Sequence, residues 1–290
     1  MLNNVCNSIE KFLPAVSRVK KFDAGVSKII ADEIKEANLD WKNFSYSEYV
    51  SEGVHSLSLY SSNGDSSNTL IKDCTPEPTD VLAKLPKTEK IIEDLGLDLM
   101  WVRLNLLRPG ACLWEHRDYS ELEDKKRLRL HLPVQTNDEA FLILEGRKVH
   151  MHEDALWKLN PADYIHGAVN NGSDRIHIVF DCYVNENLEN MVRQEVLDEA
   201  WIRGMQTPTD DDLNTKLVSA LRLYQQDRKK EAEETLLRSF YNYDFTGKSS
   251  LDLVREMYYL MGDKDQVGVW ENRITRFLKQ ESFEFLTPAS

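Results

Sequence analysis

Three side chains near the middle of the chain have the residue types and spacing of a metal site. His116 and Asp118 lie two residues apart in the segment WEHRDY, and His166 follows in the segment DYIHGAVN. Residues i and i+2 of a β-strand project from the same face, so this imidazole and carboxylate are expected to point the same way. Two imidazoles and one carboxylate are typical of non-haem iron(II) sites, which keep coordination positions open for a co-substrate and O₂. The alternative for His116 is a surface histidine in a polar hairpin.

Cationic side chains accompany these candidate ligands. Arg175 begins the segment RIHIVFD, which is expected to run antiparallel to the His166 strand after an Asn-Asn-Gly turn. A guanidinium facing the same cavity can bind a dicarboxylate through two hydrogen bonds. In the segment RLRLHL, alternation places Arg127, Arg129 and His131 on one face and three leucines on the other. This polar face either meets solvent or lines the cavity, where it would suit carboxylates.

The elements that must position these residues are mostly short strands. Residues 97–184 consist of short apolar stretches separated by turn signals, a pattern typical of a β-sandwich or jelly roll. Before them, residues 16–22 and 54–60 are predicted as strands, and Asp23 is expected to cap an amphipathic helix. Helical periodicity follows, and Gly262 is expected to end one of the helices. The predicted units are an N-terminal flank contributing to the sandwich (1–96), a catalytic β core (97–186) and a helical C-terminal domain (187–290).

Composition and charge narrow the function classes. The formal charge of −13 disfavours nucleic acid as a partner. The sequence contains no run of about 18 apolar residues, so no membrane-spanning helix is expected. The N-terminal segment lacks the pattern of a secretory signal. The four cysteines, Cys6, Cys74, Cys112 and Cys182, have neither disulfide nor zinc-site spacing. Reduced thiols and a cytoplasmic location are therefore expected.

Several spaced motifs, taken in order, resemble a known family. They are HRDY, RLRLHLPVQTN, Trp157-x-Leu-Asn160, His166-x₃-Asn170 and Arg175-x-His177-x₃-Asp181. Over residues 97–184 the chain resembles the aspartyl/asparaginyl β-hydroxylases, and within that family the bacterial proline cis-4-hydroxylase type. The resemblance implies a mainly β, double-stranded β-helix core (jelly roll, cupin-like) with flanking helices and a C-terminal α-helical domain.

The resemblance also implies cofactors and residue roles. Fe(II), 2-oxoglutarate and O₂ would be required, with iron held by His116, Asp118 and His166. Arg175 would pair with the distal carboxylate of 2-oxoglutarate, and His131 and Asn105 would help to bind this co-substrate. Arg129 matches family residues that contact carboxylates of co-substrate or substrate. Independently of the resemblance, Arg127 is expected to contact substrate because it shares the strand face of Arg129, and Trp114 is expected either to pack in the core or to wall the pocket.

The function expected from this resemblance is hydroxylation of an aliphatic carbon of a free amino acid, either proline-like or lysine-like. For a cationic substrate, Glu115 or an acidic loop residue is a candidate counter-ion. One alternative is hydroxylation of an aminoacyl group on a carrier protein, and another is a non-catalytic cupin-like sensor of a small molecule or metal. His150, His152 and Glu153 form a second, weaker candidate metal cluster. The C-terminal helices are a candidate homodimer surface.

Overall fold

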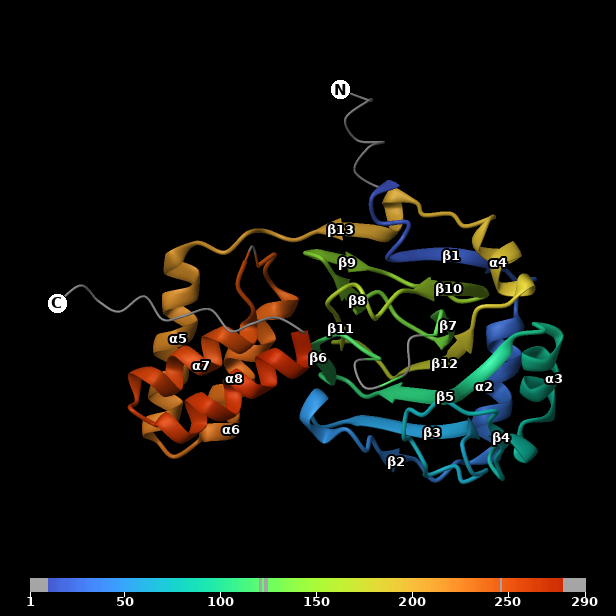
Figure 1. The fold of residues 1–290 in the computed structure, drawn as a ribbon, viewed down its shortest axis with the longest axis horizontal. Coiled ribbons are helices and arrows are strands. Elements are labelled where there is room, and N and C mark those ends of the chain that lie inside the picture. The colour runs from blue at the N-terminus through green and yellow to red at the C-terminus, as the bar shows by residue number, and fades with distance from the viewer. Residues whose placement is uncertain (1–9, 120–121, 123–124, 246, 279–290) are drawn as a thin grey trace.

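Two antiparallel β-sheets form the centre of the molecule (Figure 1). The structure is a computed structural model that describes residues 10–119, 122, 125–245 and 247–278. The major sheet has the order β1 (Val16–Lys21), β10 (Ala155–Leu159), β7 (Arg127–Gln135), β12 (Arg175–Tyr183), β5 (Asp98–Leu107), β3 (Val54–Ser61) and β2 (Lys42–Asn43), with β4 (Glu77–Pro78) on β3. The minor sheet has the order β13 (Ile202–Gly204), β9 (Arg147–Val149), β8 (Ala140–Leu144), β11 (His166–Asn170) and β6 (Cys112–His116).

The outer face of the major sheet is covered by helices. Helices α2 (Val26–Ala37), α3 (Pro86–Asp94) and α4 (Glu186–Val192) lie on this side (Figure 1). Leu130 and Leu132 of β7 join the buried cluster that contains Ile30 of α2. Because alternate residues of a strand face opposite sides, burying these leucines under α2 turns Arg129 and His131 toward the minor sheet.

The outer face of the minor sheet is covered by the C-terminal helices (Figure 1). These are α5 (Asp210–Gln225), α6 (Lys229–Leu237), α7 (Ser250–Leu260) and α8 (Lys264–Leu278). Capping boxes begin α5 at Thr209 and α7 at Ser249, so local sequence fixes both starts. As predicted, Gly262 follows the end of α7 with a left-handed φ of 74°.

The expected double-stranded β-helix core with flanking helices is confirmed by this arrangement. Strands from outside residues 97–186 also take part, because β1 and β3 belong to the major sheet and β13 pairs with β9. The α5–α8 bundle itself begins at Asp210.

The predicted cap of α2 is wrong. The N-cap residue is Gly25, with a φ of 97°, and no side chain of the helix caps it. Asp154, which lies before β10, instead accepts hydrogen bonds from the backbone nitrogens of Gly25 (2.8 Å) and Ser27 (2.7 Å). A carboxylate supplied by tertiary packing therefore takes the role expected of Asp23.

The helices and the cysteines can be compared with the expectations drawn from composition. Among the helices of the described ranges, none combines the length and the apolar character needed to cross a membrane. Cys74, Cys112 and Cys182 are free thiols, and Cys6 lies outside the described residues.

Candidate metal centre

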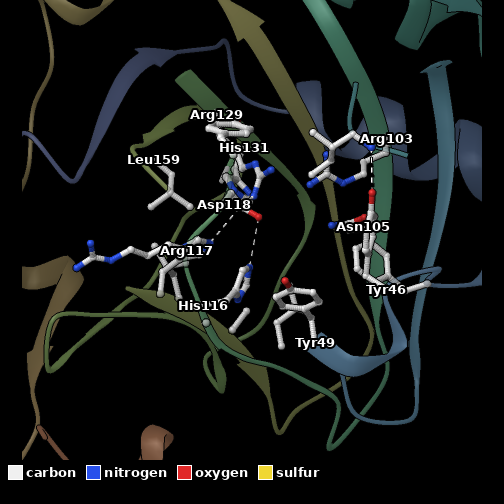
Figure 2. A pocket seen from close by; sticks show the side chains of 18 of the residues that line it. Tyr46, Tyr49, Arg103, Asn105, His116, Arg117, Asp118, Arg129, His131 and Leu159 are labelled. Atoms are coloured by element: carbon white, nitrogen blue, oxygen red, sulfur yellow. Dashed lines mark hydrogen bonds and ion pairs between the residues drawn. The ribbon is translucent and has the colours of Figure 1, made fainter. Parts of the chain in front are cut away.

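A cavity of about 150 Å³ lies between the inner faces of the two sheets. From the major sheet its walls include Arg103, Asn105, Arg129, His131 and Arg175, and from the minor sheet Leu113, His116 and His166. Figure 2 shows His116 and Asp118 pointing toward each other on one side of the cavity, with Asn105 and Arg103 on the other. Polar residues thus line a space whose surrounding core is apolar.

The three candidate ligands meet in this cavity. Their ligand atoms all lie within 4.8 Å of one another. The Nε2 atoms of His116 and His166 lie 3.7 and 3.6 Å from carboxylate oxygens of Asp118. His116 and His166 are cross-strand partners on β6 and β11. The pairing of two strands therefore brings together imidazoles that are distant in sequence.

Backbone carbonyls fix the tautomer of both histidines. Nδ1 of His116 lies 2.6 Å from the Trp114 carbonyl, and Nδ1 of His166 lies 3.2 Å from the Tyr164 carbonyl. Because a carbonyl oxygen only accepts, each Nδ1 must donate, which leaves the Nε2 lone pair for a metal.

Charge in the centre also favours the ligand forms. Burial opposes ionisation of Asp118, but the Arg129 guanidinium holds the pKa of the carboxyl below its usual range. Burial lowers the pKa of His116, and it lowers the pKa of His166 to about 3. The centre therefore presents neutral imidazoles and an ionised carboxylate, the states that bind a divalent cation.

A β-bulge decides which residues of β6 face the cavity. His166 pairs with His116 but Ala168 pairs with Leu113, so β6 carries one extra residue at this point. Leu113 and His116 both line the cavity, whereas Trp114 packs in the cluster beneath the C-terminal helices. Trp114 therefore does not line the cavity and takes the packing role that was its alternative expectation, because strict alternation breaks at the bulge.

Glu115 also faces away from the cavity, so its expected role as a substrate counter-ion is wrong. Its carboxylate is buried and accepts hydrogen bonds from Ser250 at the start of α7.

Asp181 organises the cationic wall of the cavity. It is fully buried and accepts from Nε of Arg129 at 2.8 Å and from Nη1 of Arg103 at 2.5 Å. The Tyr119 hydroxyl donates to the same carboxylate, and Arg129 also pairs with Asp118. Arg103 is a cavity residue that sequence reasoning missed; its place two residues before Asn105 on β5 was the available signal.

We predict that Asp181→Asn destabilises the protein by about 3 kcal/mol, because removing one partner leaves buried guanidinium charge uncompensated. The free energy of unfolding in urea is the measurement. Asp174→Asn is the control, since its partner Arg108 is half exposed and such a pair contributes below about 1 kcal/mol. Equal losses in the two variants would contradict the role given to Asp181.

Arg175 is a buried cation without a carboxylate partner among the described residues. Its side chain is 6% exposed, and its Nη2 lies 2.9 Å from Nδ1 of His177. Burial lowers the pKa of Arg175 to about 9. Uncompensated buried charge is costly, so this end of the cavity suits an anionic ligand. His177, for which no catalytic role was predicted from the sequence, orients the guanidinium.

The remaining expected residues divide into two groups. Asn105 and His131 are buried and line the cavity, and Asn105 accepts from the Ser56 hydroxyl at 3.0 Å. Arg127 is not among the cavity residues and pairs instead with Asp73 at 2.5 Å. Two residues along a strand span about 7 Å, which carries Arg127 beyond the end of the cavity.

The mouth of the cavity is built by distant segments. Tyr46 and Tyr49 border it from the N-terminal flank, and Arg276 borders it from α8. Tyr49 stacks on Phe277 with ring centroids 3.9 Å apart and lies 5.3 Å from the ring of His116. No local sequence signal connects these segments with the β core.

The second candidate cluster does not gather as a metal site. Within the part of the chain that the structure describes, only His116, Asp118 and His166 form such a group. Glu153 instead accepts a hydrogen bond from the backbone of Thr136 at 2.9 Å.

We predict that the metal-free protein loses stability as the pH falls below about 6.5. Burial is the main cause that holds the pKa values of His131 and His177 well below their usual value, and the positive charge of Arg175 is the second cause. Unfolding then takes up protons, so each histidine removes up to about 1.4 kcal/mol per pH unit. Urea unfolding at several pH values measures this slope. His177→Asn should flatten it, and an unchanged slope would contradict the assignment.

Comparison with known proteins identifies a matching family and distantly similar solved structures. A family model described as aspartyl/asparaginyl beta-hydroxylase matches residues 25–184. A 2OG-Fe(II) oxygenase family oxidoreductase from Burkholderia pseudomallei is similar at 12% identity, covering 56% of this chain and 79% of that one, with a TM-score of 0.41. A Pseudomonas putida prolyl-4-hydroxylase is similar at 14% identity, covering 59% and 94%, with a TM-score of 0.40.

Proposed function

Because the chain belongs to the aspartyl/asparaginyl β-hydroxylase family of Fe(II)- and 2-oxoglutarate-dependent oxygenases, we propose that it hydroxylates an aliphatic carbon of a free amino acid. The observation that carries the proposal is the set of residues that line one cavity. It holds a His-Asp-His ligand set and, in the same space, the buried guanidinium of Arg175 without a carboxylate partner among the described residues.

The residues present fit both groups that such an enzyme needs. His116, Asp118 and His166 would hold Fe(II), since their ligand atoms are already gathered and in the metal-binding protonation states. When bound, Fe(II) and 2-oxoglutarate supply the activation of O₂ that hydroxylation of an unactivated carbon requires, giving succinate and CO₂. Arg175 would bind the distal carboxylate of 2-oxoglutarate, and His131 and Asn105 would border it.

The substrate side of the cavity suits the carboxylate of an amino acid. Arg129 and Arg103 line it, and the Nη2 atom of Arg129 has no hydrogen-bond partner among the described residues. A divalent cation would compete with Arg129 for Asp118, leaving more of this guanidinium for substrate. The buried walls would exclude water from the reacting carbon and position it.

One assay tests the proposal against its alternatives. The purified chain is incubated with Fe(II), 2-oxoglutarate, ascorbate and a pool of free amino acids, and succinate and oxygen-inserted products are measured by mass. Succinate coupled to a hydroxylated free amino acid is the expected result. Product from a carrier-loaded aminoacyl group alone would favour the carrier alternative. Tight iron binding without any succinate would favour the sensor.

Two further expectations stay predictions. A homodimer through α5–α8 is tested by the molar mass in solution at increasing protein concentration. The cytoplasmic location is tested by cell fractionation.

A further inference from the structure

The C-terminal helices reach the strand that carries His116. Figure 1 shows α7 and α8 on the side of the minor sheet where β6 lies. The β-bulge at this point interrupts the regular ladder between β6 and β11, so the backbone just before His116 is held less by strand pairing than elsewhere. Contacts from the helices replace that support.

Glu115 makes one group of these contacts, with the start of α7. Its side chain is 3% exposed, and Oε1 accepts from the backbone nitrogen and the hydroxyl of Ser250 at 2.6 and 2.5 Å. The backbone nitrogen of Leu251 lies 3.3 Å from the same oxygen. The residue preceding a candidate iron ligand is thus bound to the first turn of α7, whose positive end favours a carboxylate.

The backbone on both sides of Glu115 and His116 is also bound by the helical domain. The Arg117 nitrogen donates to the Phe277 carbonyl of α8 at 2.7 Å, and the Tyr241 hydroxyl donates to the Leu113 carbonyl at 2.5 Å. Residues of the helical domain therefore bind the chain at Leu113, Glu115 and Arg117, on both sides of His116.

The strand of the second histidine is supported in the same way. A Cβ atom added to Gly167, which follows His166, would lie 2.8 Å from Cε1 of Phe240 and 2.7 Å from the Leu113 carbonyl. The helical domain and β6 therefore approach the His166 strand so closely that only glycine fits.

We propose that the α7–α8 surface positions His116 for metal binding and that Glu115 is the positioning residue that couples the two. The inference rests on the proposed function, because it assigns a role within the same centre. The physical reason is that the ligand atom of a metal-binding side chain must be held within about 0.5 Å of its binding position. A bulged strand does not provide that precision alone.

A purely structural role for Glu115 makes a different prediction, and the chain offers a matched control. Asp154 is also a carboxylate that accepts from the first backbone nitrogens of a distant helix, at 2.8 and 2.7 Å, on the far side of the major sheet. If Glu115 only stabilises the fold, Glu115→Ala should behave like Asp154→Ala. Both variants should then lower the unfolding midpoint and leave Co(II) binding unchanged.

The experiment measures Co(II) binding by titration, and the visible absorption of the bound Co(II), in the full chain. Glu115→Ala is expected to weaken Co(II) binding about 10–100-fold, the usual effect of losing a group that orients a ligand, and to alter the spectrum. Glu115→Gln keeps an acceptor oxygen and should restore both. Asp154→Ala should lower the unfolding midpoint only.

Ser250→Ala, which removes one donor to Glu115, keeps the test decisive if Glu115→Ala does not fold. We expect it to weaken Co(II) binding about 3-fold. Wild-type Co(II) affinity and spectrum in Glu115→Ala, or in Ser250→Ala where the former fails to fold, would overturn the positioning role. A wild-type chain that binds Co(II) but forms no succinate would overturn the proposed function alone. A wild-type chain that binds no divalent metal would overturn both.

Discussion

Replacing His116 by alanine is expected to lower succinate formation by at least about 10³-fold. Loss of a residue that merely orients a metal ligand commonly costs about 10–100-fold, and removal of the ligand itself costs more. His116 supplies one of three ligand atoms in a centre where no other histidine, aspartate, glutamate or cysteine of the described residues can replace it. Turnover with Fe(II) and 2-oxoglutarate is the measurement, with metal affinity as the second readout.

The control for His116→Ala is His150→Ala. His150 is also a strand-region histidine whose Nδ1 lies near a backbone carbonyl, that of Ala140 at 3.2 Å, but it does not line the cavity. It should retain turnover and metal affinity. A His116→Ala protein that forms succinate at the wild-type rate would remove the His-Asp-His centre from the reaction.

Replacing Arg175 by alanine is expected to raise the Michaelis constant for 2-oxoglutarate by about 100-fold or more. Truncating one partner of a buried, hydrogen-bonded charge pair costs about 2–5 kcal/mol, and about 1.4 kcal/mol corresponds to tenfold. Arg175→Lys should recover only part of this affinity, because an ammonium group cannot form the two parallel hydrogen bonds of a guanidinium.

Co-substrate preference separates this effect from general damage to the cavity. 2-Oxopentanoate has the same chain length as 2-oxoglutarate but lacks the distal carboxylate, so its use should be unaffected by Arg175→Ala. Arg108→Ala serves as the control, since Arg108 pairs with Asp174 at the surface. Normal 2-oxoglutarate affinity in Arg175→Ala would remove the assignment.

The arginine cluster illustrates how packing assigns roles within one sequence pattern. Arg127 and Arg129 lie on the same face of β7. Arg129 reaches the cavity and joins Asp118 and Asp181, whereas Arg127 binds Asp73 beyond its end. A pattern of alternation can identify the face of a strand, but the position along that face decides which residue contacts a ligand.

The sequence alone determined the faces of the regular strands. Alternating leucines in β7 had to be buried, so Arg129 and His131 had to face the other way. The two-residue spacing of His116 and Asp118, with a later histidine, also indicated the ligand set that the structure brings together. These features depend on local periodicity, which the backbone geometry of a strand imposes on any neighbouring residues.

Only the tertiary structure decided the features that depend on partners distant in sequence. The bulge in β6 reversed the direction of Trp114, Asp154 replaced the expected cap of α2, and Glu115 turned to α7 instead of the cavity. The first is set by the register between β6 and β11, and the other two by which backbone nitrogens at the start of a helix a distant carboxylate accepts from. The packing of the whole chain decides both, because a buried backbone donor without an acceptor is costly.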